Sequence, residues 1–331
     1  MSASASELVL THLLEAREVL LAEDLAHKLG LSAADVFAAI QSLREGGYEI
    51  GHVEQGQTRG FVLLRNPAAP LGEQIPRLLR SRVIGRELVY RDRVDSTSTL
   101  ARELADRGAA HGTAVVALTQ TAGRGRRGRT WTSLPGSQLF TSVILRPNLP
   151  PERAFELTIV AAVSLAEALE GFGLAPEIKW PNDLELDGRK VAGILAELAA
   201  EVSGRLQHVV LGFGVNVEGG AADFPEELRG RATSLSAATG HTFSSAALAA
   251  ALYERLDEWL VLHESLGFAS VLDSWRARSS TLGAEVHALV DGQVLAGIAE
   301  EVDETAALLV RDAVGHLHRL VAGEVTTLRR V

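Results

Sequence analysis

The sequence GRGRRGR occupies residues 123–129 and is followed by Thr130 and Trp131, and this stretch decides how the chain is interpreted. It formally satisfies the dinucleotide-binding pattern G-x-G-x-x-G and comes close to the P-loop pattern. Both motifs need a strand before the glycines and a helix after them, because backbone amides and the helix N-terminus must face phosphate. A strand candidate precedes the glycines, but residues 130–136 have no helical period and contain Pro135 and Gly136. Neither nucleotide-binding fold is therefore predicted.

Four arginines within residues 124–129 still make this glycine-rich loop a candidate anion site. Their charges repel one another, whereas each guanidinium offers a planar fork to a carboxylate or phosphate. The alternatives are a solvated basic loop and an RNA-contacting segment of the arginine–glycine type. Such RNA-binding tails are usually repetitive and terminal, while this loop lies between two predicted strands of a folded region. Anion binding is therefore favoured.

Outward from the loop, the predicted elements divide the chain into three parts. Residues 7–65 read as three helices followed by two strands, and residues 66–70 as a Pro-rich linker. In the central part, strands are predicted over 87–94, 113–119, 139–145, 191–198 and 209–217, with an amphipathic helix over 152–170. Hairpins beside helices indicate a mixed sheet. Towards the C-terminus, strands over 285–290, 294–302, 307–311 and 316–321 fit a small five-stranded barrel.

The composition is that of a globular protein with two or three domains. The chain has 331 residues, of which 47% are hydrophobic, and a net charge of −10, which argues against a surface that seeks nucleic acid as a whole. Without cysteine there is no disulfide, thiolate nucleophile or zinc–thiolate site. No apolar run approaches the roughly 18 residues of a membrane span and no signal peptide is visible, so a cytoplasmic protein is expected.

Lysine is rare in this sequence, so the positions where it occurs are informative. Only Lys28, Lys179 and Lys190 occur, against 29 arginines, and two of the three lie within one short stretch. Since arginine serves elsewhere as the generic cation, this stretch is expected to need a compact ammonium group.

In order and spacing, these motifs resemble those of biotin protein ligases of the bifunctional type, which carry an N-terminal winged helix-turn-helix domain. The resemblance rests on the loop at 123–129 with Trp131, on Asp95-Ser96-Thr97 and Gln120 before it, and on KWPNDL at 179–184, GRK at 188–190 and GFGVN at 212–216 after it. It implies an α/β fold with a class II synthetase-like mixed sheet between a winged helix domain and an SH3-like barrel. The implied boundaries are 1–65 for the winged helix, 66–80 for a linker, 81–280 for the biotin- and ATP-binding catalytic domain and 281–331 for the barrel.

The resemblance also implies a two-step reaction. The biotin carboxylate attacks the α-phosphate of ATP to give biotinyl-5′-AMP, and a lysine of the biotin carboxyl carrier protein of acetyl-CoA carboxylase then accepts the biotinyl group. Biotin and ATP are substrates, Mg²⁺ is the activator, and no tightly bound prosthetic group is expected. A homodimer promoted by biotinyl-AMP is expected, without membrane association.

A carboxylate that approaches a triphosphate meets like-charge repulsion, so the site must supply cations and a metal. By resemblance, Lys190, Arg126 and Asp183 are catalytic, with Asp183 as the Mg²⁺ ligand beside substrate phosphates. The residues expected to bind biotin are Ser96, Thr97, Ser98, Gln120, Arg124, Gly125, Arg126, Lys190, Gly193 and Gly212. Those expected to bind ATP or the adenylate are Gly123, Arg124, Arg126, Arg129, Trp131, Lys179, Asn182, Asn216 and Arg329.

Plain structural roles remain open for several of these residues. Asn182 and Asp183 alone read as a turn after Pro181, and Lys190 as a lysine at a hairpin end in water. Ser96 or Thr97 can equally cap a helix. The family commonly has Asn at the position of Ser98, and this chain departs from the pattern there.

Two other functions are weighed. A lipoate ligase or a relative of class II aminoacyl-tRNA synthetases would share the architecture. Lipoate, however, lacks the ureido group that Ser96, Thr97 and Gln120 suit, and the acidic composition argues against tRNA. A biotin-responsive transcriptional repressor is the other alternative, and it is compatible with ligase activity.

The predicted recognition helix weakens the case for operator DNA as a partner. Its outward positions are mostly alanine, and Asp35 would lie beside phosphates. Residues 1–65 carry five basic and nine acidic side chains, a net charge of −4, which is the reverse of the usual footprint. Phe37 is therefore expected to pack against protein, either the ligase core or a second subunit. DNA binding stays open, because a dimer would bring Arg44 and Arg59 of two subunits together.

Overall fold

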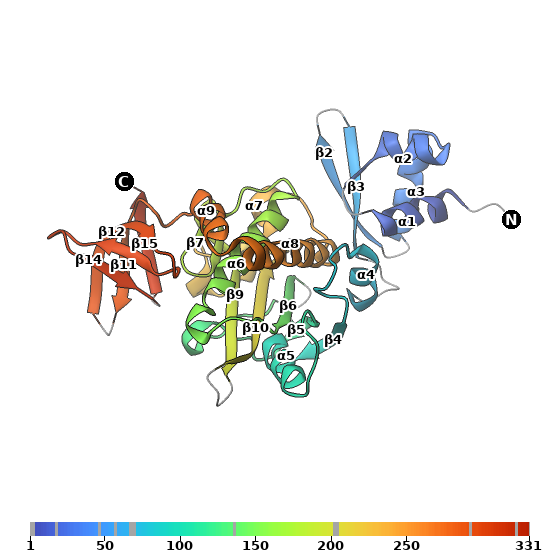
Figure 1. Cartoon of the computed structure of the whole chain (residues 1–331). Coiled ribbons are helices and arrows are strands. Elements are labelled where there is room, and N and C mark those ends of the chain that lie inside the picture. Colours follow the sequence, from blue (N-terminus) through green and yellow to red (C-terminus); the bar gives the residue numbers. More distant parts are fainter. Residues whose placement is uncertain are drawn as a thin grey trace.

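The computed structural model describes residues 4–16, 19–45, 48–55, 58–65, 71–134, 137–200, 205–290, 293–321 and 324–330. Figure 1 shows three units in chain order: a unit of helices and a small sheet at the N-terminus, a central unit of sheet and helices, and a small all-β unit at the C-terminus. This mixed architecture confirms the predicted fold class. No helix of the described residues is long and apolar enough to cross a membrane.

The N-terminal unit has the predicted order of helices and strands. Its helices are α1 (Ala5–Glu15), α2 (Ala22–Leu29) and α3 (Ala33–Glu45), and its strands β1 (Leu20–Leu21), β2 (Glu49–Gln55) and β3 (Thr58–Arg65) pair in the order β1-β3-β2. Helix α3 is capped as expected, because Ser32 Oγ accepts from the Asp35 amide at 3.1 Å and the Asp35 carboxylate accepts from the Ser32 amide at 3.0 Å. The unit has a core of its own.

Phe37 lies elsewhere than the sequence suggests. Its ring meets Phe61 of β3 edge to face at 5.4 Å, and the side chain is 38% exposed. Phe37 therefore packs on protein within its own unit, and contact of its exposed part with a second subunit stays a prediction.

Helix α4 (Leu71–Leu78) falls inside the range 66–80 that the sequence predicts as a linker. Ile75 is fully buried in the large central core, and α4 packs against helix α8 (Ser245–Leu266) and strand β4 (Leu88–Val94). Pro76 inside the helix explains why propensity alone misses it. We propose that the catalytic domain begins at Leu71; residues 66–70 lie outside the described residues.

The central sheet has seven strands in the order β4-β5-β6-β10-β9-β8-β7. The strands after β4 are β5 (Ala114–Gln120), β6 (Gln138–Leu145), β7 (Glu177–Lys179), β8 (Asp183–Leu186), β9 (Arg189–Ala200) and β10 (Leu206–Asn216). Strands β4 and β5 are parallel, whereas the other neighbouring pairs are antiparallel, so the sheet is mixed as predicted.

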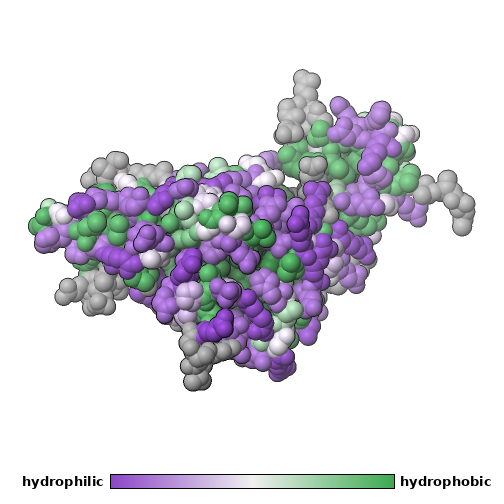
Figure 2. Space-filling view, viewed as in Figure 1, coloured by the Kyte–Doolittle hydropathy of each residue, from purple (hydrophilic) through white to green (hydrophobic). Residues whose placement is uncertain are grey.

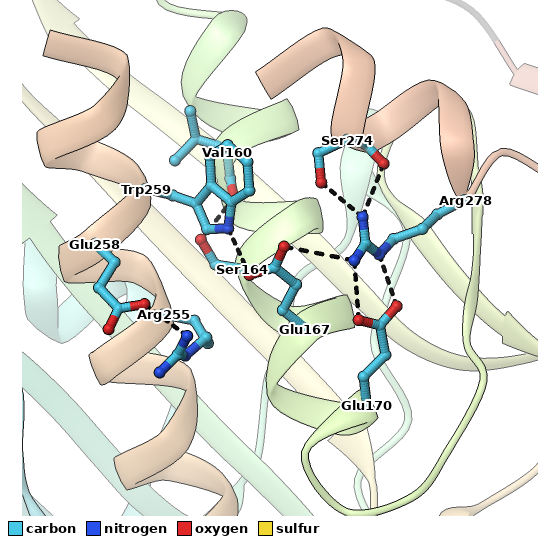
Figure 3. Close-up of polar contacts among 9 residues, drawn as sticks. All are labelled: Val160, Ser164, Glu167, Glu170, Arg255, Glu258, Trp259, Ser274 and Arg278. Carbon is cyan, nitrogen blue, oxygen red and sulfur yellow. Dashed lines mark hydrogen bonds and ion pairs between the residues drawn. The ribbon is translucent and has the colours of Figure 1, made fainter. Parts of the chain in front are cut away.

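Helices cover the two faces of this sheet unequally. On one face lie α6 (Glu156–Glu170), α8 and α9 (Ala269–Ala277), packed on residues such as Val143 and Leu211. On the other face α5 (Thr97–Asp106) covers alternate residues of the same strands, among them Ile144 and Val210. Because α5 is short, it leaves part of the second face to the arginine-rich loop. Figure 3 shows that the three helices of the first face are joined by polar contacts, with Arg278 between Glu167 and Glu170.

Short elements complete the central unit. The 3₁₀ turns are η1 (Arg126–Gly128), η2 (Pro151–Arg153), η3 (Ala221–Asp223) and η4 (Glu226–Leu228), and α7 (Leu235–Thr239) is a single short helix. The helix predicted over 152–170 therefore begins with η2 and continues as α6. As expected, no helix follows the glycine-rich loop, where residues 131–134 are extended or irregular.

The C-terminal unit is an antiparallel sheet of five strands. They are β11 (Ala284–Val290), β12 (Gln293–Val302), β13 (Leu308–Arg311), β14 (Leu317–Leu320) and β15 (Glu324–Arg330), in the order β14-β13-β12-β11-β15. This fits the predicted SH3-like barrel. The unit is joined to the centre by the Trp180 indole, which donates to the Ala306 carbonyl at 3.1 Å. Figure 2 shows apolar side chains among polar ones on its surface, where Val294 and Val314 are 67% and 78% exposed.

A cavity of about 500 Å³ separates the N-terminal unit from the central unit. Leu13 and Val62 line it from the N-terminal unit, α4 contributes Leu78, and Phe172 and Phe243 close it from the centre. None of the residues predicted to bind biotin or ATP lines it, so this cavity is distinct from the candidate site.

Candidate functional site

The floor of the candidate site is a patch of bare backbone on β9 and β10. Gly193 pairs with Gly214 across the two strands, and Leu195 pairs with Gly212. A Cβ atom on Gly193 would lie 2.8 Å from Trp131 Cζ3, and one on Gly214 would lie 2.8 Å from Trp131 Cε2. The Trp131 indole therefore lies directly on the backbone of both strands, which only glycine permits. Of the two, Gly193 is predicted from the sequence and Gly214 is not.

One wall is a buried polar cluster at the start of α5. Both the amide and the hydroxyl of Thr97 donate to Gln120 Oε1, at 2.7 and 3.1 Å. Ser142 of β6 donates to Thr97 Oγ1 at 2.8 Å and lies 3.1 Å from the hydroxyl of Ser98. A Cβ atom on Gly212 would lie 2.5 Å from Ser98 Oγ. The cluster thus brings predicted residues together and adds Ser142, which the sequence analysis did not single out.

Ser96 completes this wall. It is the N-cap of α5 and is 2% exposed, but its side chain makes no capping hydrogen bond. Its amide instead donates to the Asp95 carboxylate at 2.6 Å. The alternative role as a side-chain cap is therefore wrong for Ser96.

The second wall is the arginine-rich loop itself. The Gly125 amide donates to the Arg129 carbonyl at 2.8 Å, and the Trp131 amide donates to the Gly123 carbonyl at 2.9 Å. A Cβ atom on Gly123 would lie 2.7 Å from the Trp131 carbonyl oxygen. The loop is therefore a narrow hairpin whose glycines allow its two sides to approach closely. The Arg129 side chain, which follows the turn at the tip, is exposed.

Two arginines of the loop reach back to the sheet. Arg124 Nη2 lies 2.5 Å from Glu197 Oε2 on β9, and Arg126 Nη1 donates to Asn182 Oδ1 at 3.2 Å. The side-chain Nδ2 group of Asn182 in turn donates to the Ile194 carbonyl at 2.6 Å. One cation of the loop, Arg124, is thus paired with a carboxylate of the chain itself, Glu197, which the sequence does not single out.

The two lysines of the predicted stretch lie at the same end of the sheet. Lys190 Nζ is 2.7 Å from Asp183 Oδ1 and 5.4 Å from the centre of the Trp131 ring, and Lys179 Nζ is 3.2 Å from Glu185 Oε1. Lys190 and Asp183 remain 35% and 27% exposed. The alternative of a hairpin lysine that points only into water is therefore wrong for Lys190.

Asp183 is the residue predicted to bind a magnesium ion, and the structure places it beside Lys190. Among the described residues, no three His, Cys, Asp or Glu side chains form a metal cluster. A single carboxylate beside a nucleotide fits Mg²⁺, which takes one or two protein carboxylates and completes its shell with substrate phosphates and water. The donor set is therefore compatible with a metal that arrives with the nucleotide.

Two further residues predicted to bind the nucleotide are Asn216 and Arg329. The Asn216 side chain accepts from Gln138 Nε2 at 2.7 Å and donates to the Thr233 carbonyl at 3.0 Å, while Gln138 holds the backbone of Leu134 at 2.7 Å. Asn216 is therefore engaged in fixing the segment after the loop. The backbone of Arg329 pairs with Glu285 of β11, but its side chain lies outside the described residues.

Two buried donors in the site have no protein acceptor. Within the described part of the chain, Trp131 Nε1 and Arg124 Nε are buried without a hydrogen-bond partner. Buried polar atoms without partners are uncommon and destabilising. Both atoms belong to the loop, so the loop has hydrogen-bonding capacity left for a ligand or water.

Comparisons with known proteins agree with this geometry. A model of the biotin/lipoate A/B protein ligase family matches residues 90–216, which span the polar wall, the loop and the glycine floor. The bifunctional ligase/repressor BirA of Bacillus subtilis is 35% identical over 294 residues, covering 88% of this chain and 89% of that protein. The chain therefore belongs to the biotin protein ligase family.

Two other relatives are named as biotin ligases. The biotin–[acetyl-CoA-carboxylase] ligase of Paracoccus denitrificans is 36% identical and matches 67% of this chain and 93% of its own length. The biotin protein ligase of Aquifex aeolicus, solved in complex with biotin and ATP, has 29% identity and a TM-score of 0.62, and covers 74% of this chain and 99% of that chain. The match to BirA covers most of both chains, so this chain is similar to a bifunctional member over most of its length.

Proposed function

We propose that this chain activates biotin with ATP to biotinyl-5′-AMP and transfers the biotinyl group to a lysine of a biotin carboxyl carrier protein. The observation that carries the proposal is the glycine floor, which lies between the hydroxyl and amide groups at Gln120 and the cations at Lys190. A ligand with a neutral polar ring at one end and a carboxylate at the other matches that polarity. Relatives named biotin ligases and a relative solved with biotin and ATP support the assignment.

The polar wall suits the ureido ring of biotin. Gln120 already accepts from Thr97, so its Nε2 group is left to donate, while the hydroxyls of Ser96 and Ser98 can donate or accept. A ring that carries both N–H and C=O groups needs this mixture inside an otherwise apolar slot. Lipoate offers no such group, which favours biotin.

Adenylation would take place at the other end of the floor. A biotin carboxylate oxygen attacks the α-phosphorus of ATP, and the bond to the bridging oxygen breaks so that pyrophosphate leaves. Lys190 stabilises the negative charge that builds up between carboxylate and phosphate, and Arg126 holds the substrates from the loop. Asp183 would hold Mg²⁺, which neutralises phosphate charge. The Asp183–Lys190 contact keeps the ammonium at this position before substrates bind.

In the second step, the amine of a carrier lysine attacks the carbonyl carbon of the mixed anhydride. The C–O bond to phosphate breaks, AMP leaves with the electron pair, the nitrogen releases a proton to solvent, and an amide forms. The loop would shield the anhydride from water until the carrier arrives.

Mass spectrometry of a carrier protein tests the proposal. After incubation with this chain, biotin, ATP and Mg²⁺, one lysine of the carrier should gain the mass of a biotinyl group. Omission of ATP should abolish the modification, and lipoate should not replace biotin. An unmodified carrier, together with absence of biotin-dependent pyrophosphate release, would contradict the proposed ligase activity.

DNA binding is the second candidate function. Relatives named bifunctional ligase/repressor match about nine-tenths of this chain, including the winged helix unit, which favours the repressor role left open above. The net charge of −4 in residues 1–65 means that one copy alone has little attraction for phosphates. DNA binding is therefore expected only when biotinyl-AMP pairs two chains.

Fluorescence anisotropy with labelled promoter DNA of biotin-synthesis genes can decide this point. Nanomolar binding that requires biotinyl-AMP and weakens steeply with salt is the expected result for a repressor. Equal affinity for unrelated DNA, or none at all, would leave the chain with its ligase role only.

A further inference from the structure

Glu197 is the acidic residue that faces the ligand side of the sheet beside the arginine-rich loop. It follows Gly193 and Leu195 on the same face of β9 and pairs across the strands with Val210, whereas Leu195 pairs with Gly212 of the polar wall. Glu197 therefore lies beyond the ureido end of the floor, on the side away from Lys190. Its side chain is 23% exposed, and its carboxylate reaches Arg124 Nη2 at 2.5 Å.

The loop is consequently tethered at two separate places. Arg124 ties it to Glu197 beyond the ureido end, and Arg126 ties it to Asn182 near the nucleotide end. Both Arg124 and Glu197 are partly withdrawn from water, which strengthens a charge-assisted hydrogen bond over an exposed ion pair. The four arginines of the loop repel one another, so a fixed counter-charge such as Glu197 is needed for the loop to pack against the sheet.

We propose that Glu197 is a positioning residue that latches the arginine-rich loop over the biotin slot through Arg124. The inference rests on the proposed function and deepens it. With the latch closed, the loop covers the ureido end and slows the escape of biotin and of biotinyl-AMP. Glu197 lies away from Lys190 and Asp183, so it governs ligand retention and leaves the chemical step to other residues.

The test uses the full chain with Glu197→Gln, which removes the charge and keeps the shape. Dissociation of biotin and of biotinyl-AMP should become about tenfold faster, the factor that corresponds to losing roughly 1.4 kcal/mol from a partly buried charged hydrogen bond. The KM for biotin should rise by a similar factor, while kcat for adenylation at saturating biotin should stay within about twofold. Glu197→Asp, which keeps the charge, should restore part of the retention.

A matched control is available on the other face of the sheet. Glu170 pairs with Arg278 at 2.7 Å between α6 and α9, a contact of the same kind far from the loop (Figure 3). Glu170→Gln should leave biotin dissociation and KM unchanged. An equal change in both variants would overturn the latch, because it would reveal a general effect on stability.

A second readout needs no catalytic activity. Trypsin cleaves after arginine, and the loop carries four arginines, so the rate of cleavage within residues 123–129 reports opening of the loop. Glu197→Gln should be cleaved several-fold faster than the parent without ligand, and Glu170→Gln should not. Equal cleavage with equal biotin dissociation would refute the latch. A parent chain that forms no biotinyl-AMP while this cleavage difference persists would instead refute the proposed function alone.

Discussion

Lys190 is held between two groups of opposite character, a carboxylate at 2.7 Å and the face of an indole at 5.4 Å. Such a setting fixes the direction of the ammonium without burying it. In the proposed mechanism, the same group would move from Asp183 towards the charge that develops between carboxylate and phosphate.

Lys190→Ala should therefore slow biotin-dependent pyrophosphate release by roughly 10²- to 10³-fold, as expected for the loss of one transition-state stabiliser. Biotin affinity should change much less, since the ureido wall is untouched. The matched control is Lys28→Ala, which removes an exposed lysine of the N-terminal unit. An unchanged rate in Lys190→Ala would remove this residue from the catalytic set.

At the level of elements, α6 and α8 are fastened by a buried charged group. Glu156 is 3% exposed, Arg153 donates to it at 2.6 and 2.9 Å, and His263 of α8 lies 2.7 Å away. Burial raises the pKa of the Glu156 carboxyl, but hydrogen bonds from His263 and Arg153 together outweigh burial and hold its pKa below the ordinary value of 4.5. A pKa that is lower in the folded chain means that ionised Glu156 stabilises the fold above pH 4.5.

Glu156→Gln should lower the free energy of unfolding of the central unit by about 1–3 kcal/mol at pH 7, because it weakens a buried charged network. The deficit should shrink as the pH falls below 4.5, where the parent carboxyl becomes protonated and its contribution is lost. Urea denaturation at several pH values measures this, with Glu152→Gln on the exposed turn η2 as the control. A deficit that does not depend on pH would contradict the charged role.

The helices and strands differ in how well they could be predicted from the sequence. Strands β5, β6, β9 and β10 were predictable because each is long and apolar. Helix α8 was not, since apolar residues surround much of it and give no single stripe. Strands β7 and β8 have three and four residues, too few for a period to emerge. The arginine-rich loop was recognisable from composition, but Glu197 is 73 residues from Arg124, and no local pattern connects them.

At the scale of the whole molecule, the N-terminal unit stands apart. Its core is separate from the large core, and a cavity of about 500 Å³ lies between them. The central and C-terminal units, by contrast, share one continuous core. Cooperative unfolding follows continuous packing, so the two cores are expected to melt separately.

Differential scanning calorimetry should accordingly show two transitions. Biotin alone, at about 100 times its dissociation constant, should stabilise the ligand-binding part by about 2.7 kcal/mol, which moves the larger transition up by roughly 5–10 °C. The smaller transition should stay in place. A single transition that shifts as a whole would show that the units are energetically coupled despite the cavity.

The position of Trp131 has one practical consequence. Of the four tryptophans in the chain, Trp180 and Trp275 are buried in the core, and Trp259 is hydrogen-bonded to Glu167 in the helical layer. Only the indole of Trp131 rests on the glycine floor, where the proposed function places the ligand, so ligand binding is expected to change its surroundings. The intrinsic fluorescence of Trp131 should therefore change with ligand binding. The unmodified protein can then report ligand association and dissociation in real time.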